Sequence, residues 1–149
     1  MDPKIYKLHR ENEKEHWWYK GRREIISSTI NKFVEKKNNI KILDFGAGSG
    51  TNTMMLSNYG EVYVYEKDKE THQYLKKKFE KISNIFVLDE ITNNIFFDLI
   101  IASDVIEHIN DDSKIIEFLS SILKNDGNNL ITVPAYNFLY TERDKVLGH

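Results

Sequence analysis

A short glycine-rich segment after an apolar run holds the residues whose types and spacing best suit ligand binding. Lys41–Thr51 reads KILDFGAGSGT, and its acid, Asp44, is followed by glycines at alternate positions: Gly46, Gly48 and Gly50. Glycine accepts positive φ and lets the backbone approach a ligand that a side chain would repel. In open α/β sheets, ligands bind beyond the carboxyl ends of the strands. The segment therefore predicts a strand, a ligand-binding turn and the start of a helix.

The spacing of the glycines distinguishes between kinds of nucleotide-binding turn. The dinucleotide fingerprint is G-x-G-x-x-G, and counting from Gly46 places its third glycine at Thr51. A nicotinamide-dependent dehydrogenase is therefore disfavoured. A phosphate-binding P-loop is excluded, because no Lys-Ser or Lys-Thr pair follows the turn.

Acids stand at two further points where predicted strands end. Glu66 follows Glu61–Tyr65 and lies about 20 residues beyond the first glycine. Nucleotide-binding folds place there the acid that accepts hydrogen bonds from ribose hydroxyls. Asp89 and Glu90 follow a strand predicted over Ile85–Leu88. These last two acids could also belong to a solvated loop.

Three segments together resemble motifs of the class I S-adenosylmethionine (SAM) dependent methyltransferases. The D-x-G-x-G-x-G of the glycine segment is similar to their motif I. The run Phe97–Ile109, F-D-L-I-x-x-x-D-V-I-E-H-I, is similar to motif IV of the small-molecule enzymes, a broad group that includes quinone-biosynthesis enzymes. The run Leu123–Ala135 is similar to L-K-P-G-G-x-L-x-x-T-V-P-A, with Asn125-Asp126 in place of Pro-Gly. The resemblance covers nearly the whole chain.

This resemblance implies a SAM-dependent methyltransferase with a Rossmann-like, doubly wound α/β fold. Its mainly parallel sheet would have about five strands, with helices on both faces and without the family's final β-hairpin. The glycine turn would receive the methionine part of SAM, Glu66 the ribose and Asp89 the adenine. The implied cofactor-binding residues come from the turn, from loops after the strands and from the N-terminal segment: Asp44, Gly46, Ala47, Gly48, Gly50, Glu66, Lys67, Asp89, Glu90, Ser103, Tyr19 and Arg22. The product would be S-adenosylhomocysteine (SAH).

Asp104 and His108 are the candidate catalytic residues. By resemblance, Asp104 would lie beside the sulfonium and the incoming acceptor. His108 could act as a general base, because an imidazole can take up a proton near neutral pH. Glu107 and His108 could instead support a divalent ion, or both could be structural. Two adjacent ligands are a weak metal signal, so no metal site is predicted.

The elements that must position these residues follow from the spacing of apolar side chains. Residues 1–37 are predicted to form an N-terminal helical lid segment, and residues 38–149 the SAM-binding part of a single domain. Further helices are predicted at 52–59 and 69–82 and from 111 to 127, and strands at 40–44, 61–65, 85–88, 97–102 and 129–133.

Particular side chains are expected on the buried face of each helix. In the first helix, the apolar stripe is Ile25, Ile26, Ile30, Phe33 and Val34. In the second, Met54–Leu56 should face inward, with Gly60 as its stop, and in the third the row is His72, Leu75, Phe79 and Ile82. In the last, the buried residues should be Ile115, Ile116, Leu119, Ile122 and Leu123. Lys76–Lys78 should be a solvated face.

The composition is that of a soluble globular protein. Of the 149 residues, 40% are apolar and 30% charged, and the formal net charge is −2, which gives no reason to expect nucleic acid as an obligate partner. Cysteine is absent, so neither disulfides nor thiolate metal sites hold the fold. No apolar run is long enough to cross a membrane. We therefore expect a cytoplasmic protein without membrane insertion, acting with a small-molecule methyl acceptor.

The sequence stops at His149, where the family usually continues into two more strands. The segment Tyr136–His149 resembles the family's loop after the fifth strand. Asn129–Val133 would then be an edge strand that a second copy could cover in a homodimer. Two functions stay open: a methyltransferase acting on a small molecule or biosynthetic intermediate, and a SAM-binding but inactive or truncated module that serves as a partner or regulatory subunit.

Overall fold

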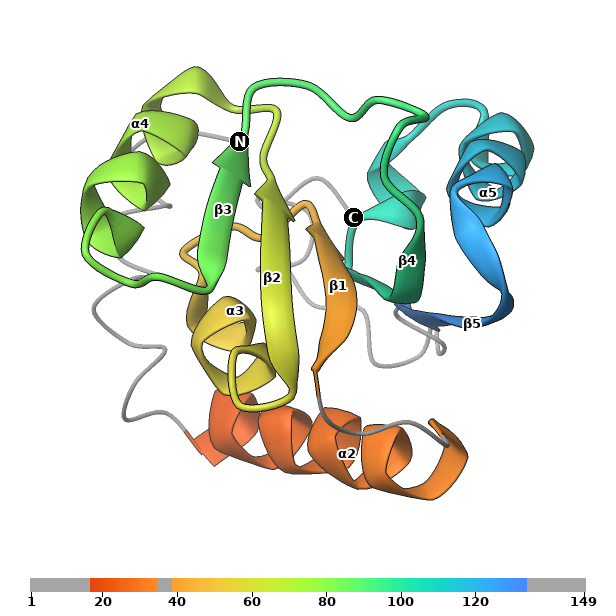
Figure 1. Ribbon diagram of the computed structural model, residues 1–149, viewed down its shortest axis with the longest axis horizontal. Coiled ribbons are helices and arrows are strands. Elements are labelled where there is room, and N and C mark those ends of the chain that lie inside the picture. Colours follow the sequence, from red (N-terminus) through yellow and green to blue (C-terminus); the bar gives the residue numbers. More distant parts are fainter. Residues whose placement is uncertain (1–16, 35–38, 134–149) are drawn as a thin grey trace, which may run out of the picture.

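A five-stranded parallel sheet forms the centre of the protein (Figure 1). The computed structural model describes residues 17–34 and 39–133. The strand order is β3-β2-β1-β4-β5. The strands are β1 Ile40–Phe45, β2 Gly60–Tyr65, β3 Ile85–Leu88, β4 Phe97–Ser103 and β5 Leu123–Thr132. The helices are α2 Trp17–Phe33, α3 Thr51–Leu56, α4 Lys69–Phe79, the short 3-10 helix η1 Ile106–His108 and α5 Asp112–Ser121.

The order of the strands creates a topological switch point at the carboxyl ends of β1 and β4, called the crevice below. From β1 the chain moves outward through β2 to β3, then returns to the other side of β1 for β4 and β5. The direction of the connections therefore reverses between β1 and β4. Open α/β sheets bind their ligands at such a reversal. The predicted fold class is confirmed.

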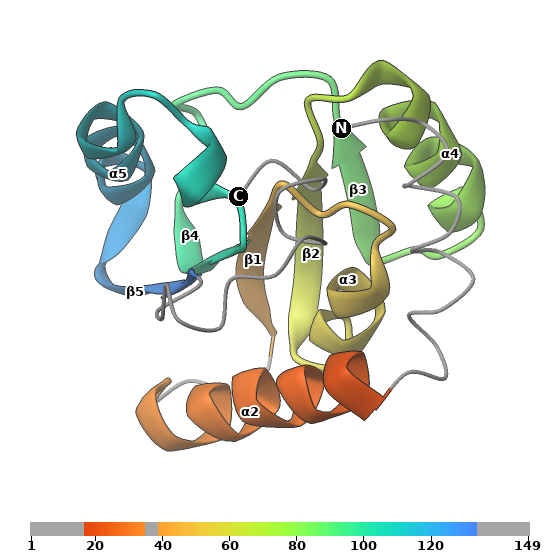
Figure 2. The same cartoon turned by 180° about the vertical axis from the view of Figure 1, so that it is seen from behind.

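Side chains alternate between two core layers on the two faces of the sheet. In β1, Ile40 and Ile42 pack with residues of α2, α3 and α4, whereas Leu43 and Phe45 pack in a second cluster with α5. All four are at most 6% exposed. Both views place α4 beside β3 at one edge of the sheet and α5 beside β5 at the other (Figures 1 and 2). Helices therefore cover both faces, as a doubly wound fold requires.

Helix α2 packs on the sheet through a narrower row of residues than the sequence predicted. Ile26, Ile30 and Val34 are buried, as expected, but Ile25 is 68% and Phe33 62% exposed. Successive residues turn by about 100° around a helix, so Ile25 lies well off the row formed by Ile26, Ile30 and Val34. Including Ile25 and Phe33 in the buried stripe was wrong. The remainder of the predicted lid, residues 1–16 and 35–37, lies outside the described residues.

The predicted side-chain directions of α3 were partly wrong. Leu56 is buried and Met55 partly buried, but Met54 is 43% exposed. Helix α3 ends at Leu56, before the predicted stop, and Gly60 is the first residue of β2. Helix α4 likewise ends at Phe79, before the predicted Ile82.

Helix α5 ends at Ser121 and β5 begins at Leu123, so the predicted helix end at Asn125–Gly127 was wrong. The Oδ2 atom of Asp98 accepts hydrogen bonds from the Lys41 amide and the Lys124 ammonium, both at 2.8 Å. This contact holds the start of β5 against β4, and a register shift between Phe97 and Leu99 accommodates the extra residues.

The buried face of α5 is also smaller than predicted. Ile116 is 38% exposed, whereas Leu119 and Ile122 are buried. Strand β5 forms one edge of the described sheet, as predicted. Whether a second copy covers this edge stays a prediction, and Tyr136–His149 lies outside the described residues.

Replacing Ile30 by Ala tests whether α2 is part of the core. Ile30 is 0% exposed, so Ile30→Ala should lower the free energy of unfolding by about 2–5 kcal/mol through lost burial and the cavity left behind. Ile25→Ala, the same change on the same helix, should stay within about 0.5 kcal/mol of wild type. Urea denaturation of both variants measures the difference. Equal losses would contradict the burial described for α2.

Candidate functional site

The turn after β1 is fixed to the end of the neighbouring strand β2. The amides of Gly46 and Ala47 both donate to the carbonyl of Tyr65, at 2.8 and 3.2 Å. The amide of Gly50 donates to the carbonyl of Ala47 at 2.9 Å, which closes the turn. Gly46, Gly48 and Gly50 have φ of +73°, +54° and +74°. The sequence thus predicted correctly that this segment needs glycine.

The three glycines meet different surroundings. A Cβ on Gly46 would lie 2.5 Å from Cγ2 of Val105, and one on Gly50 would lie 2.7 Å from the ring of Phe79. Among the described residues, a Cβ on Gly48 would meet no atom within 4 Å. Packing therefore requires two of the glycines, while Gly48 has an open side that a ligand could approach.

Glu66 lies directly against this turn. Its Oε2 accepts from the Gly48 amide at 2.9 Å, and its Oε1 accepts from the Asp68 amide at 2.9 Å. A carboxylate oxygen has further acceptor capacity, so these bonds still allow Glu66 to accept from a ligand. Lys67, the next predicted cofactor residue, is exposed in the same loop. The spacing of about 20 residues predicted correctly that Glu66 and the glycines meet.

Asp44 points away from the surface. It is 2% exposed, and its Oδ2 accepts from the Thr53 hydroxyl at 2.6 Å, which ties β1 to α3. Burial raises the pKa of Asp44 to about 6; the Thr53 hydrogen bond acts in the opposite direction, and the nearby charge of Glu66 adds to the rise. In this structure Asp44 supports the turn from behind. Direct contact with a cofactor stays a prediction.

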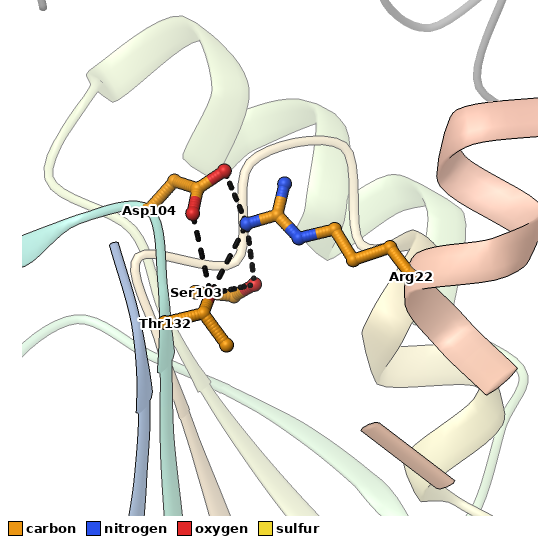
Figure 3. A network of polar contacts seen from close by, with 4 residues as sticks. All are labelled: Arg22, Ser103, Asp104 and Thr132. Atoms are coloured by element: carbon orange, nitrogen blue, oxygen red, sulfur yellow. Dashed lines mark hydrogen bonds and ion pairs between the residues drawn. The ribbon is translucent and has the colours of Figure 1, made fainter. Parts of the chain in front are cut away.

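A second polar cluster lies at the ends of β4 and β5. Figure 3 shows Arg22 reaching from α2 toward Ser103, Asp104 and Thr132. Its Nη2 donates to the hydroxyls of Ser103 and Thr132, both at 3.1 Å, and forms an ion pair with Oδ2 of Asp104. The Thr132 hydroxyl donates to Oδ1 of Asp104 at 3.2 Å. Residues from three distant parts of the chain therefore form one network.

This network holds the side chain of Asp104 from two sides. Both of its carboxylate oxygens have partners, one from Arg22 and one from Thr132, and Asp104 itself has φ of +54°. A catalytic role of Asp104 stays a prediction. Thr132 was missed by the sequence analysis. Its position at the end of a predicted strand, in the L-I-T-V-P-A run, was the signal that could have indicated it.

Asp89 has its partners on α4. The ammonium of Lys76 and Nε2 of His72 lie 2.6 and 3.1 Å from its Oδ1, and Asp89 remains 78% exposed. The hydrogen bond from Lys76, more than that from His72, holds the pKa of Asp89 below its usual range. Glu90 follows it and is exposed. A contact of either acid with adenine stays a prediction.

His108 lies in η1, beyond the end of β4, and is exposed, whereas both carboxylate oxygens of its neighbour Glu107 are shielded from solvent. Within residues 17–34 and 39–133, no group of three or more histidine, aspartate or glutamate side chains is placed to hold a metal ion. Tyr19, a further predicted cofactor residue, is half-buried one turn before Arg22 on α2.

Two shallow hollows lie away from this crevice. One, of about 350 Å³, is lined by α4 and β3 residues including Phe79 and Phe86. The other, of about 320 Å³, lies between α2 and α3 and includes Arg23 and Met55. Neither involves the glycine turn. The candidate site therefore depends on the turn, Glu66 and the Arg22 cluster, and not on an enclosed cavity. None of the described helices is long and apolar enough to cross a membrane.

Comparison with known families gives a match over most of the chain. The sequence profile of a family described as "Methyltransferase domain" matches residues 17–147. The comparison with curated proteins gave no match.

Several solved structures share the fold. A SAM-dependent methyltransferase from Clostridium acetobutylicum gives a TM-score of 0.71 at 20% identity, over 91% of this chain and 58% of that one. A candidate sarcosine dimethylglycine methyltransferase from Galdieria sulphuraria gives 0.70 at 21% identity, over 77% and 47%. Coclaurine N-methyltransferase, bound to N-methylheliamine and SAH, gives 0.62 at 15% identity, over 73% and 35%. The chain thus spans about half the length of these relatives, or less.

The raised pKa of Asp44 predicts a specific dependence of stability on pH. The folded protein binds this proton more tightly than the unfolded chain, whose aspartate has a pKa of 3.8, so the free energy of unfolding falls as pH rises from 3.8 to about 6 and levels off above that. As pH falls from 7 to 4, wild type should therefore gain on the order of 2–3 kcal/mol relative to Asp44→Asn, which does not titrate.

Urea denaturation of the two proteins across this pH range measures the difference. Asn keeps an oxygen that can accept from Thr53, so the comparison isolates the charge. Curves that stay parallel from pH 7 to pH 4 would contradict the buried, protonatable Asp44.

Proposed function

Because this chain belongs to the class I family of SAM-dependent methyltransferases, we propose that it binds SAM at the glycine turn and transfers the methyl group to a small-molecule acceptor. The observation that carries this proposal is the open side of Gly48, which lies beside the carboxylate of Glu66. A cofactor with a ribose needs such a pair: a backbone without Cβ and an acceptor for hydroxyl groups.

The residues present fit this cofactor. Gly46, Ala47, Gly48 and Gly50 would form the surface on which its methionine part rests, and Glu66 would accept from the ribose. Lys67, Asp89 and Glu90 would line the adenine side. Tyr19, Arg22 and Ser103 would lie on the methionine side, where a guanidinium suits a carboxylate. Asp44, held by Thr53, would stabilise the turn from its buried side.

In the proposed reaction, the main task of the protein is to position the methyl donor and the acceptor. SAM supplies a methyl group already activated by its sulfonium charge. The side chains need to hold donor and acceptor in line and to exclude water. The Arg22 network supports this role, because it ties α2 to the ends of β4 and β5 beside the crevice. We propose that α2, as part of the N-terminal segment, covers the site from a fixed position.

Acceptors whose nucleophile carries a proton would need a base. His108 is the proposed base, because it is exposed just beyond the end of β4. Asp104 is proposed to lie beside the sulfonium and the incoming acceptor, with its carboxylate held by Arg22 and Thr132.

The acceptor is proposed only as a small molecule. Membership in the quinone-biosynthesis group, cytoplasmic location and a homodimer through β5 stay predictions. A SAM-binding module without activity is not favoured, because the matching family profile and the similar solved structures are those of methyltransferases.

Binding of SAM is tested by isothermal titration calorimetry on wild type and Gly48→Ala. A Cβ at residue 48 clashes with no atom in residues 17–34 and 39–133, so the variant should fold and lose about 1–2 kcal/mol through its left-handed backbone. Its affinity for SAM should fall more than about tenfold, because the methyl group occupies the ligand's side of the turn.

Gly21→Ala is the matched control, since a Cβ there also meets open space but lies on α2. NAD should bind neither wild type nor Gly48→Ala. A Gly48→Ala variant that binds SAM like wild type would refute the glycine turn as the cofactor site.

Replacement of His108 by Ala should lower turnover by about 10²-fold or more if His108 takes the acceptor's proton, with the KM for SAM nearly unchanged. Methyl transfer from SAM to a panel of amine, hydroxyl and carbon acceptors provides the assay. Asn110→Ala, in the same exposed turn, should behave like wild type. Unaltered turnover in His108→Ala would remove this residue from the mechanism.

A further inference from the structure

Lys78, on α4, contacts the glycine turn. Its ammonium donates to the carbonyl oxygen of Ser49 at 2.7 Å, across 29 residues of sequence. Lys76 contacts Asp89 instead, and Lys77 is exposed. The prediction that Lys76–Lys78 is simply a solvated face was therefore wrong for Lys78, which is half-buried.

The side chain of Lys78 is held by aromatic rings of its own helix. Its ammonium lies 5.1 Å from the centre of the Phe79 ring and 5.7 Å from that of Tyr74. A cation over an aromatic face gains about 0.5–1 kcal/mol at exposed sites. The rings therefore favour one placement of a side chain that would otherwise be flexible.

The same helix limits the position of Gly50. Cζ of Phe79 and Cδ2 of Leu75 lie 2.7 and 2.8 Å from where a Cβ of Gly50 would be. Helix α4 thus meets the turn twice, with an apolar wall at Gly50 and with a cation at the carbonyl of Ser49.

These two contacts fix the orientation of one peptide group. The peptide between Ser49 and Gly50 is planar, so a fixed carbonyl direction also fixes the direction of the Gly50 amide. That amide donates to Ala47 and closes the turn. The Ser49 carbonyl, held by Lys78, and the Gly50 amide, held by Ala47, therefore fix the same peptide from its two ends. A charge-assisted hydrogen bond is about twice as strong as a neutral one, which makes Lys78 an effective anchor.

We propose that Lys78 is a positioning residue for the cofactor: by holding the carbonyl of Ser49, it keeps the glycine turn in the shape that SAM binds. This inference rests on the proposed SAM site. Lys78 is assigned no contact with the cofactor, so its effect should appear in affinity and not in the methyl-transfer step.

Three variants test this role by calorimetric titration with SAM: Lys78→Met, Lys78→Arg and Lys77→Met. Lys78→Met keeps much of the apolar stem but has no donor, and its dissociation constant for SAM should rise about tenfold. Lys78→Arg keeps a charged donor and should stay within about threefold of wild type. Lys77→Met removes the same charge from the neighbouring exposed position and should bind SAM like wild type.

The outcomes separate this inference from the proposed function. Failure of wild type to bind SAM would refute the proposed function itself. Binding by wild type together with equal binding by Lys78→Met would overturn only the role of Lys78. Melting temperatures without SAM serve as the second readout: Lys78→Met should melt below wild type, because it loses a hydrogen bond, yet be fully folded at the temperature of the titration, so that weaker binding reflects the turn and not unfolding. If the Met variant does not fold, Lys78→Gln, which is shorter and uncharged, replaces it under the same criteria.

Discussion

The two hydrogen bonds from Gly46 and Ala47 to the carbonyl of Tyr65 are the interaction on which the candidate site depends. They force the turn after β1 to lie on the end of β2, where Glu66 follows. Glu66 then accepts from the amide of Gly48. The turn, the acid and the open side of Gly48 are therefore parts of one arrangement, set by the pairing of two neighbouring parallel strands.

Buried apolar side chains mainly hold α2 on the sheet. The ion pair of Arg22 with Asp104 determines which polar groups the first turns of α2 meet. Ile26 and Ile30 are at most 1% exposed, and complete burial of such a side chain contributes about 1.5–3 kcal/mol. The pair between Arg22 and Asp104 is partly exposed, with side chains 20% and 29% accessible, and pairs in water contribute about 0–1 kcal/mol. The apolar contacts therefore hold the helix, while Arg22 determines which polar groups meet at the crevice.

Much of the fold followed from local patterns in the sequence. Continuous apolar runs such as Phe97–Ala102 marked strands that are buried on both faces. The patterns predicted the boundaries of elements less reliably where a residue could belong to either of two neighbouring elements. Leu123 was predicted to lie on the buried face of the last helix. In the structure it begins β5, and the contact of Asp98 with Lys124 holds this segment against β4.

The candidate site was predictable where it is local in sequence. The glycines and Glu66 belong to consecutive strand ends, so spacing alone placed them together. Arg22 and Thr132 are 110 positions apart and meet because α2 packs on the sheet, whereas the register of β4 with β5 places Thr132 beside Ser103. The exposure of Ile25 depended in the same way on how α2 is rotated against the sheet.

The close contact of Gly46 with Val105 has a consequence for the shape of the crevice. A methyl group placed on Gly46 would overlap both γ carbons of Val105, so the turn after β1 and the segment after β4 already touch at this point. Val105 therefore limits how closely the segment after β4 can approach the turn after β1. At this point the spacing between the ends of two neighbouring strands is determined by the bulk of one apolar side chain, and not by a hydrogen bond.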